Sequence, residues 1–217
     1  MVTAYYPLSK CKHSPEKYME WIHKFFECVT CPVVCFCPPE LEARFQTLNK
    51  GNVRIVPREF TSFKMMSPEW MEKWRTWYLV DPERAYHSPE LYAVWAAKQE
   101  FVREAIPMVD STHYVWCDIG CFRTERNGSF RKAPRYCVGD KLTCLHVSNT
   151  IGGGVLAGTP KAWALFSETY IKSLTESVNG KDQTVYNRIL NATNATIIPA
   201  NDSLGDKWFY LTYIFSD

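Results

Sequence analysis

Two carboxylates and a lysine stand at positions where a folded chain can place reactive groups. Asp118 directly follows the apolar run 114–117, so it lies where a buried strand leaves its sheet. A carboxylate there can hold a divalent cation that bridges two phosphates. The glycine at Gly120 lets a ligand approach the backbone closely. The alternative interpretation is an ordinary Asp-x-Gly turn without a ligand.

Lys98 falls on the apolar face of an expected helix, where a charged side chain needs a partner. The helix begins after Ser88 and ends near Ile106. Because an unpaired buried ammonium is costly, Lys98 is expected to pair with Asp118 on the next strand or with a phosphate. The alternative is that its ammonium reaches solvent between the neighbouring aromatic rings.

Two further segments offer polar atoms to a ligand. Asp182 and Gln183 begin a short expected helix, and such a pair on a turn can hydrogen-bond several sugar hydroxyls. A plain N-cap role is the alternative for Asp182. The glycines at 152–154 predict a flexible turn, which either presents backbone groups to a ligand or binds nothing. That run matches neither the P-loop nor the dinucleotide fingerprint.

The cysteines and one basic loop give weaker signals. Cys28, Cys31, Cys35 and Cys37 do not have the spacing of a zinc knuckle, so we interpret them as small buried apolar side chains. The loop 123–135 carries five basic residues against one acidic residue. It can attract an acidic or phosphorylated substrate, although a solvated mobile loop is the commoner case.

Length and composition exclude several classes of protein. The chain has 217 residues with 25 basic and 23 acidic side chains, and this net charge of +2 argues against a nucleic-acid partner. No run approaches 18 apolar residues, which predicts no transmembrane segment. The first six residues do not form a signal peptide, so we expect a cytoplasmic protein with reduced thiols. Aromatic residues reach 15%, and such rings can line pockets for flat ligands.

The expected elements alternate between strand and helix. Strands are expected at 2–6, 32–37, 53–56, 113–117, 142–147, 196–198 and 208–215, and helices at 14–28, 39–49, 88–106, 159–177 and after 182. The motif Ser-Pro-Glu at Ser14, Ser67 and Ser88 marks three helix starts. This alternation predicts one α/β domain over 1–217 with a mostly parallel central sheet flanked by helices. Its ligand is expected beyond the carboxyl ends of the strands.

The order of these motifs resembles that of the GT-A-fold glycosyltransferases, and most closely the HtrL/YibB-like family and the glycosyltransferase domain that chloroviruses use on capsid glycans. The resemblance runs over nearly the whole chain, from the first strand to Lys98, Asp118, the glycine run and Asp182-Gln183. It implies a single GT-A-like (Rossmann-like) domain. It further implies transfer of a sugar from a nucleotide-diphosphate donor, UDP foremost, to a glycan or glycoprotein acceptor, in the host cytoplasm if the protein is viral.

The resemblance also implies the residues that bind the donor. The nucleotide would bind at the end of the first strand. The diphosphate would bind a basic residue near the end of the chain. The glycines and the Asp-Gln pair would hold the sugar and the acceptor. Asp182 would lie nearest the transferred sugar, and the motif order favours retention of configuration. The donor-binding and catalytic residues implied in this way are Thr3, Ala4, Tyr5, Lys98, Asp118, Gly120, Gly153, Gly154, Asp182, Gln183 and Lys207.

A divalent cation belongs to the same set of implications. Asp118 would take the first position of the family's metal-binding Asp-x-Asp and hold Mn²⁺ or Mg²⁺. Gly120 stands where the second aspartate is expected, so any further metal ligand has to come from elsewhere. This departure leaves open a second interpretation, a non-catalytic module that only binds a glycan or a nucleotide.

Overall fold

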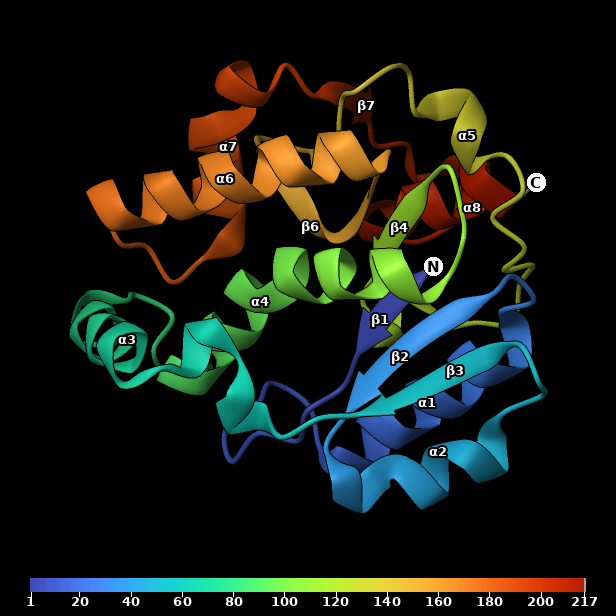
Figure 1. Cartoon of the computed structure of the whole chain (residues 1–217), viewed down its shortest axis with the longest axis horizontal. Helices are drawn as coiled ribbons and strands as arrows, with labels where there is room; N and C mark the ends of the chain where they lie inside the picture. The colour runs from blue at the N-terminus through green and yellow to red at the C-terminus, as the bar shows by residue number, and fades with distance from the viewer. Residues whose placement is uncertain (217) are drawn as a thin grey trace.

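The computed structural model describes residues 1–216, except for the side chains of Leu190 and Asn191. Within that range seven strands form one sheet in the order β3-β2-β1-β4-β6-β5-β7 (Figure 1). Every neighbouring pair is parallel except the two pairs that include β6. The strands are β1 (Val2–Ala4), β2 (Val33–Cys37), β3 (Val53–Pro57), β4 (Tyr114–Cys117), β5 (Thr143–Val147), β6 (Thr150–Gly158) and β7 (Thr196–Pro199).

Helices cover both faces of the sheet. They are α1 (Pro15–Cys28), α2 (Glu42–Leu48), α3 (Pro68–Val80), α4 (Pro89–Ala105), α5 (Ala133–Tyr136), α6 (Pro160–Glu176), α7 (Asp182–Thr193) and α8 (Tyr210–Ser216). Helices α3, α4, α6 and α7 share one hydrophobic core with the sheet, and α1, α2, α5 and α8 share the other. The expected α/β domain with a mostly parallel sheet is therefore confirmed.

Serine side chains begin three helices as expected. Ser14, Ser67 and Ser88 accept hydrogen bonds from the backbone nitrogens of Lys17, Trp70 and Leu91, respectively. Each cap satisfies a backbone donor that the first helical turn leaves free, and the following proline needs no such partner. The third cap matters most for the site, because it sets where α4 begins and therefore which of its side chains face the sheet.

The glycine run at 152–154 is not the flexible turn that the sequence predicted. These residues lie inside β6, which pairs with β4 on one side and with β5 on the other. Glycine weakens a strand but allows other groups to approach its backbone closely. Side chains from α7 and from the end of the chain occupy that space, so the missing Cβ atoms serve packing and not flexibility.

The expected final strand at 208–215 is also wrong. Those residues form a 3-10 turn, η7 (Lys207–Phe209), followed by α8. Asp206 accepts a hydrogen bond from the backbone nitrogen of Trp208 and so caps the turn. Leu211, Thr212 and Phe215 are buried together, which is the spacing of a helical face. The run is aromatic enough to read as a strand, but it lacks the alternation of a half-buried one.

Smaller differences affect element ends. The helix expected at 39–49 divides into a 3-10 turn, η1 (Pro39–Leu41), and α2. Strand β1 ends at Ala4, so Tyr5 and Tyr6 belong to the loop that follows. Within the described part of the chain, no helix is both long and apolar enough to cross a bilayer.

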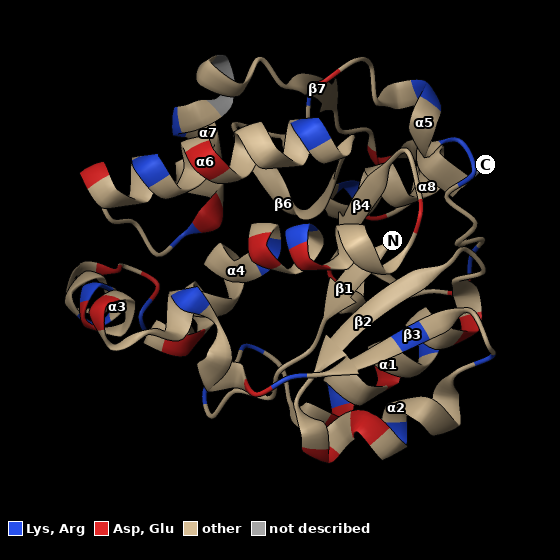
Figure 2. Ribbon diagram, viewed as in Figure 1, with Lys and Arg blue, Asp and Glu red and all other residues tan. Residues whose placement is uncertain are grey.

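The order of the strands defines a preferred place for a ligand. From β1 the chain proceeds outward through β2 and β3 on one side, and it returns at β4 to build the other side. The loops that follow β1 and β4 therefore diverge and leave a crevice at the carboxyl ends of these two strands. Figure 2 shows β1, β2 and β6 without a charged residue, so any charge in the crevice comes from the loops and helices around it.

Candidate functional site

A cavity of about 440 Å³ opens at the crevice between β1 and β4. Its walls are the loops after these strands, the start of α1, one face of α4 and the ring of Phe209. Pockets for small ligands usually measure roughly 300–1,000 Å³. The cavity is thus large enough for a small organic ligand and lies where this sheet topology favours one.

Lys98 joins the elements beneath the cavity. Its side chain is 4% exposed, and its ammonium donates to Oδ2 of Asp182 and to the carbonyl oxygen of Gly153, each at 2.9 Å. Oδ1 of Asp118 lies 3.3 Å from the same nitrogen. The expected pairing with Asp118 is confirmed, and the alternative of an ammonium in solvent is wrong. Four segments far apart in sequence meet at this one charge.

Asp118 lies at the end of β4 and borders the cavity. Its Oδ1 accepts a 2.7 Å hydrogen bond from the indole nitrogen of Trp116, and its side chain is 38% exposed. No protein partner of Oδ2 exists among the described residues, so that oxygen is free for a ligand. Burial raises the pKa of Asp118; the charge of Lys98 opposes this and that of Asp182 adds to it.

The charges in this cluster strongly influence one another. Burial alone would lower the pKa of Lys98, but the carboxylates of Asp118 and Asp182 outweigh burial and raise it above the ordinary value. Lys98 is therefore cationic at every physiological pH. Burial, and then the nearby charge of Asp182, raise the pKa of Tyr186 as well. Lys98 is thus a fixed cation beneath the cavity, and the phenol of Tyr186 stays neutral.

Two glycines of β6 make this cluster possible. A Cβ atom at Gly153 would clash with the carboxylate of Asp182 and lie 3.2 Å from the Tyr186 ring. A Cβ atom at Gly154 would lie 3.2 Å from the ring of Phe209 and 3.6 Å from Oδ2 of Asp118. Any side chain at either position would displace the groups that border the cavity.

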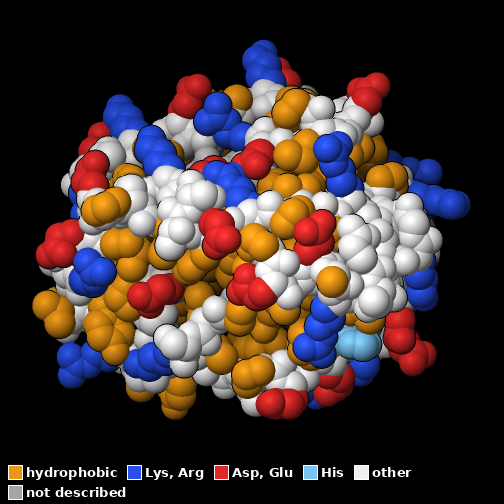
Figure 3. All heavy atoms as spheres, turned by 60° about the horizontal axis from the view of Figure 1, so that its bottom comes forward, with side chains coloured by type: hydrophobic (Ala, Val, Ile, Leu, Met, Phe, Trp, Pro, Cys, Tyr) orange, Lys and Arg blue, Asp and Glu red, His pale blue; other side chains and the backbone are white. Residues whose placement is uncertain are grey.

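Aromatic rings and positively charged side chains line the cavity together. The lining side chains include three lysines or arginines and, among the described residues, a single carboxylate, that of Asp118. Tyr5, Tyr18 and Trp21 form a run of neighbouring rings on one wall, with centroids 6.0 Å and 5.5 Å apart. Figure 3 shows that both signs of charge interleave on the face it draws.

The donor set for a metal ion is small. In the described part of the chain, no three His, Cys, Asp or Glu side chains come together as metal ligands. Asp182 is bonded to Lys98, and Gly120 adds no carboxylate. Mg²⁺ is commonly held by one or two carboxylates together with substrate phosphates. Asp118 fits that limited role, whereas a closed protein cage for a metal does not exist in this part of the chain.

The structure separates the predicted residues into three groups. Those that line the cavity are Ala4, Tyr5, Lys98, Asp118 and Gly120. Those packed behind it are Thr3, Gly153, Gly154 and Asp182. Gln183 and Lys207 do not line it: the Gln183 backbone nitrogen donates to Asp182 Oδ1 at 2.7 Å, and the Lys207 ammonium lies 3.4 Å from Ser148 Oγ. The Thr3 hydroxyl is buried without a hydrogen-bond partner among the described residues.

Trp116 is a site residue that the sequence reasoning missed. It stands two residues before Asp118, and side chains at i and i+2 of a strand point to the same face. That spacing could have suggested an indole N–H aimed at the carboxylate. The hydrogen bond fixes the orientation of Asp118 and leaves Oδ2 as its available oxygen.

A hydrogen-bonded pair of His87 and Asp81, just before α4, was also missed by the sequence reasoning. His87 lines the cavity, and its Nδ1 lies 2.8 Å from Oδ2 of Asp81. Asp81 is buried and also accepts hydrogen bonds from the Tyr92 hydroxyl and the Glu83 backbone nitrogen. Burial raises its pKa, but these hydrogen bonds together lower the pKa below the usual value. The fixed carboxylate in turn holds the imidazole of His87 at the cavity wall.

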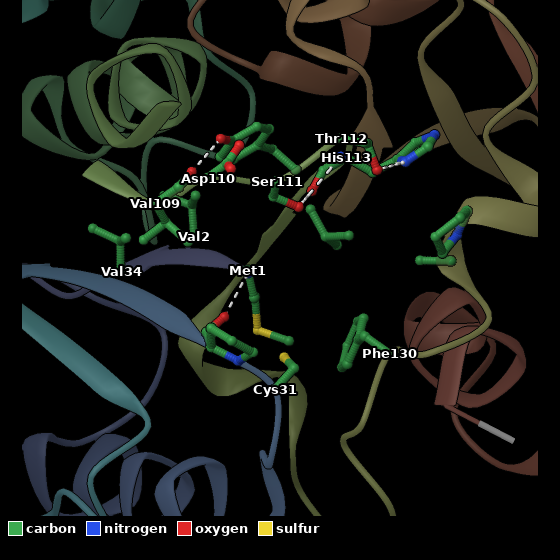
Figure 4. A pocket seen from close by; sticks show the side chains of 15 residues that line it. Met1, Val2, Cys31, Val34, Val109, Asp110, Ser111, Thr112, His113 and Phe130 are labelled. Carbon is green, nitrogen blue, oxygen red and sulfur yellow. Dashed lines mark hydrogen bonds between the residues drawn. The ribbon is translucent and has the colours of Figure 1, made fainter. Parts of the chain in front are cut away.

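A second hollow lies at the opposite edge of the sheet (Figure 4). It measures about 190 Å³ and sits at the amino ends of β1, β2 and β4. Its polar side chains bond within their own segment: Ser111 Oγ donates to the His113 carbonyl at 2.9 Å, and Thr112 Oγ1 lies 2.9 Å from Nδ1 of His113. The amino group of Met1 donates to the Pro32 carbonyl oxygen at 2.8 Å. Among the described residues, none of its side chains takes part in an ion pair with another side chain.

Comparison with known proteins adds no family to this description. A scan against protein-family profiles finds no match, and a search of curated proteins finds none either. The fold therefore rests on the structure alone, and the function has to be argued from the cavity and its residues.

Proposed function

We propose that the protein is a glycosyltransferase that uses a nucleotide-diphosphate sugar. The observation that carries the proposal is the cavity at the β1–β4 crevice, in which a free carboxylate oxygen, the cations Lys12 and Arg123 and a run of aromatic rings occur together. A nucleotide sugar has the matching parts: a flat base, an anionic diphosphate and a polar sugar. The resemblance of the motif order to GT-A-fold glycosyltransferases supports the same assignment.

Each wall of the cavity has a role in this proposal. The rings of Tyr5 and Tyr18 offer flat surfaces on which a base can stack, since stacking needs no particular sequence of hydrogen bonds. Lys98 and Trp116 hold Asp118 in one orientation at the end of β4. The oriented carboxylate is itself negative, so it would stabilise the charge that develops on a leaving diphosphate only through a cation held at its free oxygen.

A divalent cation has a limited place in the mechanism. Asp118 would hold Mn²⁺ or Mg²⁺ through Oδ2, with the phosphates of the donor as the other ligands. When bound, such an ion neutralises the leaving diphosphate. Lys98 neutralises Asp118 from beneath, so this carboxylate alone attracts a cation weakly and the ion is expected to bind together with the nucleotide.

Asp182 takes a different place from the one that the resemblance implied. We expected it nearest the transferred sugar, yet its carboxylate lies behind Lys98 and is 6% exposed. We infer that it positions Lys98 and through it Asp118. Retention of the sugar's configuration stays a prediction.

The nine cysteines form no disulfide among the described residues, which supports the cytoplasm as the location.

The direct test of the proposal is nucleotide binding with and without Mn²⁺. Wild-type protein is expected to bind UDP more tightly when Mn²⁺ is present, and Asp118→Ala is expected to lose this dependence because Oδ2 is gone. Isothermal titration calorimetry measures both affinities. Asp110→Asn serves as the control, because it removes an exposed carboxylate at the other edge of the sheet. Identical Mn²⁺ dependence in Asp118→Ala and wild type would contradict the assignment.

A non-catalytic binding module is the second candidate function. Gly120 in place of an aspartate and the engagement of both carboxylates, Asp118 and Asp182, by Lys98 are the observations that favour it. The two candidates differ in turnover. A transferase releases free UDP from UDP-sugars when incubated with acceptor or water. A binding module binds UDP-sugars but does not cleave the bond between the sugar and the diphosphate. A screen of UDP-sugars for UDP release separates them.

A further inference from the structure

Arg123 occupies a fixed position on the cavity wall. It follows the 3-10 turn η5 (Ile119–Cys121), five residues after Asp118. The centre of its guanidinium lies 4.6 Å from the ring of Trp21 and 4.9 Å from that of Phe209. A guanidinium held by two rings keeps its place while its edge stays open to a ligand. Its side chain is 44% exposed, so the edge is accessible.

One of the two rings that hold Arg123, that of Phe209, lies close to Gly154, as does the free oxygen of Asp118. The position of a Cβ atom on Gly154 would contact both the Phe209 ring and Oδ2 of Asp118, at 3.2 Å and 3.6 Å. Phe209 and Oδ2 of Asp118 thus border the same backbone position, and Arg123 lies over the Phe209 ring. Arg123, Asp118 and Lys98 all line the cavity, so a group bound at Asp118 shares it with both cations.

The positive charge of Arg123 is only weakly compensated. Among the described residues its one acidic partner is Asp206, at 3.6 Å between Nη1 and Oδ2, and that carboxylate is 34% exposed. Lys12 and His13 line the cavity on the same wall. Burial lowers the pKa of His13, and the charges of Arg123, Lys12 and Lys17 lower it further. On this wall two cations, Arg123 and Lys12, have the half-exposed Asp206 as their counter-charge among the described residues, whereas Lys98 is balanced by two carboxylates.

We propose that Arg123 binds the diphosphate of the donor and that Asp206 holds the same guanidinium while the cavity is empty. The inference rests on the proposed function and names the residue that recognises the phosphates. A guanidinium forms two parallel hydrogen bonds to a phosphate, which a half-exposed ion pair at 3.6 Å does not match. The diphosphate displaces Asp206. The resemblance pointed to Lys207 for this task, but its ammonium lies near Ser148 and not at the cavity.

The experiment compares the affinities of UDP, UMP and uridine by calorimetry. Arg123→Gln is expected to weaken UDP at least tenfold and UMP less, and to leave uridine unchanged, because only the phosphates lose a partner. Arg123→Lys keeps the charge but not the fork, and it is expected to bind UDP with intermediate affinity. Asp206→Asn is expected to bind UDP several-fold more tightly, since the competing carboxylate is removed.

Two controls keep the result specific. Arg135→Gln removes a positive charge from an exposed position of α5 outside the cavity, and it is expected to bind UDP like wild type. Lys207→Ala tests the rival assignment. Wild-type UDP affinity in a folded Arg123→Gln variant, or a loss confined to Lys207→Ala, would overturn the inference and leave the proposed function standing. A wild-type protein that binds no nucleotide would overturn both.

Discussion

The two edges of the sheet show how differently one fold can use its strand ends. At the carboxyl edge, Lys98, Asp118, Gly153 and Asp182 meet from four separate segments, and the longest of their contacts spans 84 positions. At the amino edge, Ser111 and its neighbours bond within their own segment. Both edges have a hollow, but among the described residues only the carboxyl edge joins a buried side-chain cation to carboxylates from distant segments.

The difference teaches which observation points to function. A hollow with polar groups is not enough, since the amino edge has one (Figure 4). Local hydrogen bonds such as that of Ser111 satisfy a turn and need no ligand. Long-range convergence of charges has an energetic cost, because each ion loses its water. Charged groups that are buried at such a cost and border a cavity are therefore candidates for chemistry.

The largest effect is expected at Lys98. Lys98→Met keeps the aliphatic stem but leaves two carboxylates without their cation, so the free energy of unfolding is expected to fall by about 3–5 kcal/mol. UDP binding is expected to fall as well, because Asp118 loses its orientation. Urea unfolding and calorimetry measure the two effects. Lys161→Met is the matched control, since its ammonium is exposed and pairs only at the surface.

A double variant sharpens this result. If Lys98 acts chiefly by neutralising Asp182, then Asp182→Asn in the Lys98→Met background is expected to restore part of the lost stability, with a coupling of roughly 0.5–3 kcal/mol. Purely additive effects of the two changes would mean that the ion pair contributes nothing beyond its parts. The contrast between the two edges would then lose its energetic basis.

The next effect concerns the close approach of β6. Gly153→Ala is expected to destabilise the protein by about 1–3 kcal/mol, because its Cβ atom would meet the Asp182 carboxylate and the Tyr186 ring. Gly152→Ala is a matched control in the same strand, where the nearest atoms lie at 3.6 Å. Thermal unfolding compares the two. Equal melting temperatures would show that β6 and α7 adjust freely and that the cluster is not tightly packed.

A pH-dependent effect is expected at Asp81. Its pKa is below the usual value in the folded protein, so it adds stability above its unfolded pKa of about 3.9, and this contribution is lost as the pH falls through the lowered folded pKa. Asp81→Asn is expected to cost about 1–3 kcal/mol at pH 7. The stability curves of variant and wild type should converge below pH 4. Parallel curves in urea titrations from pH 7 to pH 3 would contradict this.

The smallest effect is expected at the amino edge. Ser111→Ala removes two local hydrogen bonds at an exposed turn and should change stability by no more than about 0.5 kcal/mol. UDP affinity is expected to stay unchanged, because the hollow of Figure 4 lies at the other end of the strands. A clear fall in UDP affinity in this variant would place the nucleotide site at the amino edge and contradict the contrast between the two edges.

Local patterns in the sequence determined most of the secondary structure. The Ser-Pro-Glu motifs fixed three helix starts, because a serine cap and a following proline act within one turn. Lys98 on an apolar helix face predicted a buried pair, since an unpaired ammonium cannot be buried cheaply. The short apolar runs gave the parallel strands. These signals depend on neighbours within a few residues, so a single sequence carries them.

Only the tertiary structure decided how the glycines, the end of the chain and the charges are used. Gly153 looked like part of a turn until Asp182 and Tyr186 were placed against it. The run 208–215 became helical because Phe209, Leu211 and Phe215 pack into a core that the sequence does not display. Asp182 and Arg123 acquired their positions from partners up to 84 residues distant. Such contacts depend on the whole fold, whereas sequence patterns report only what neighbouring residues require.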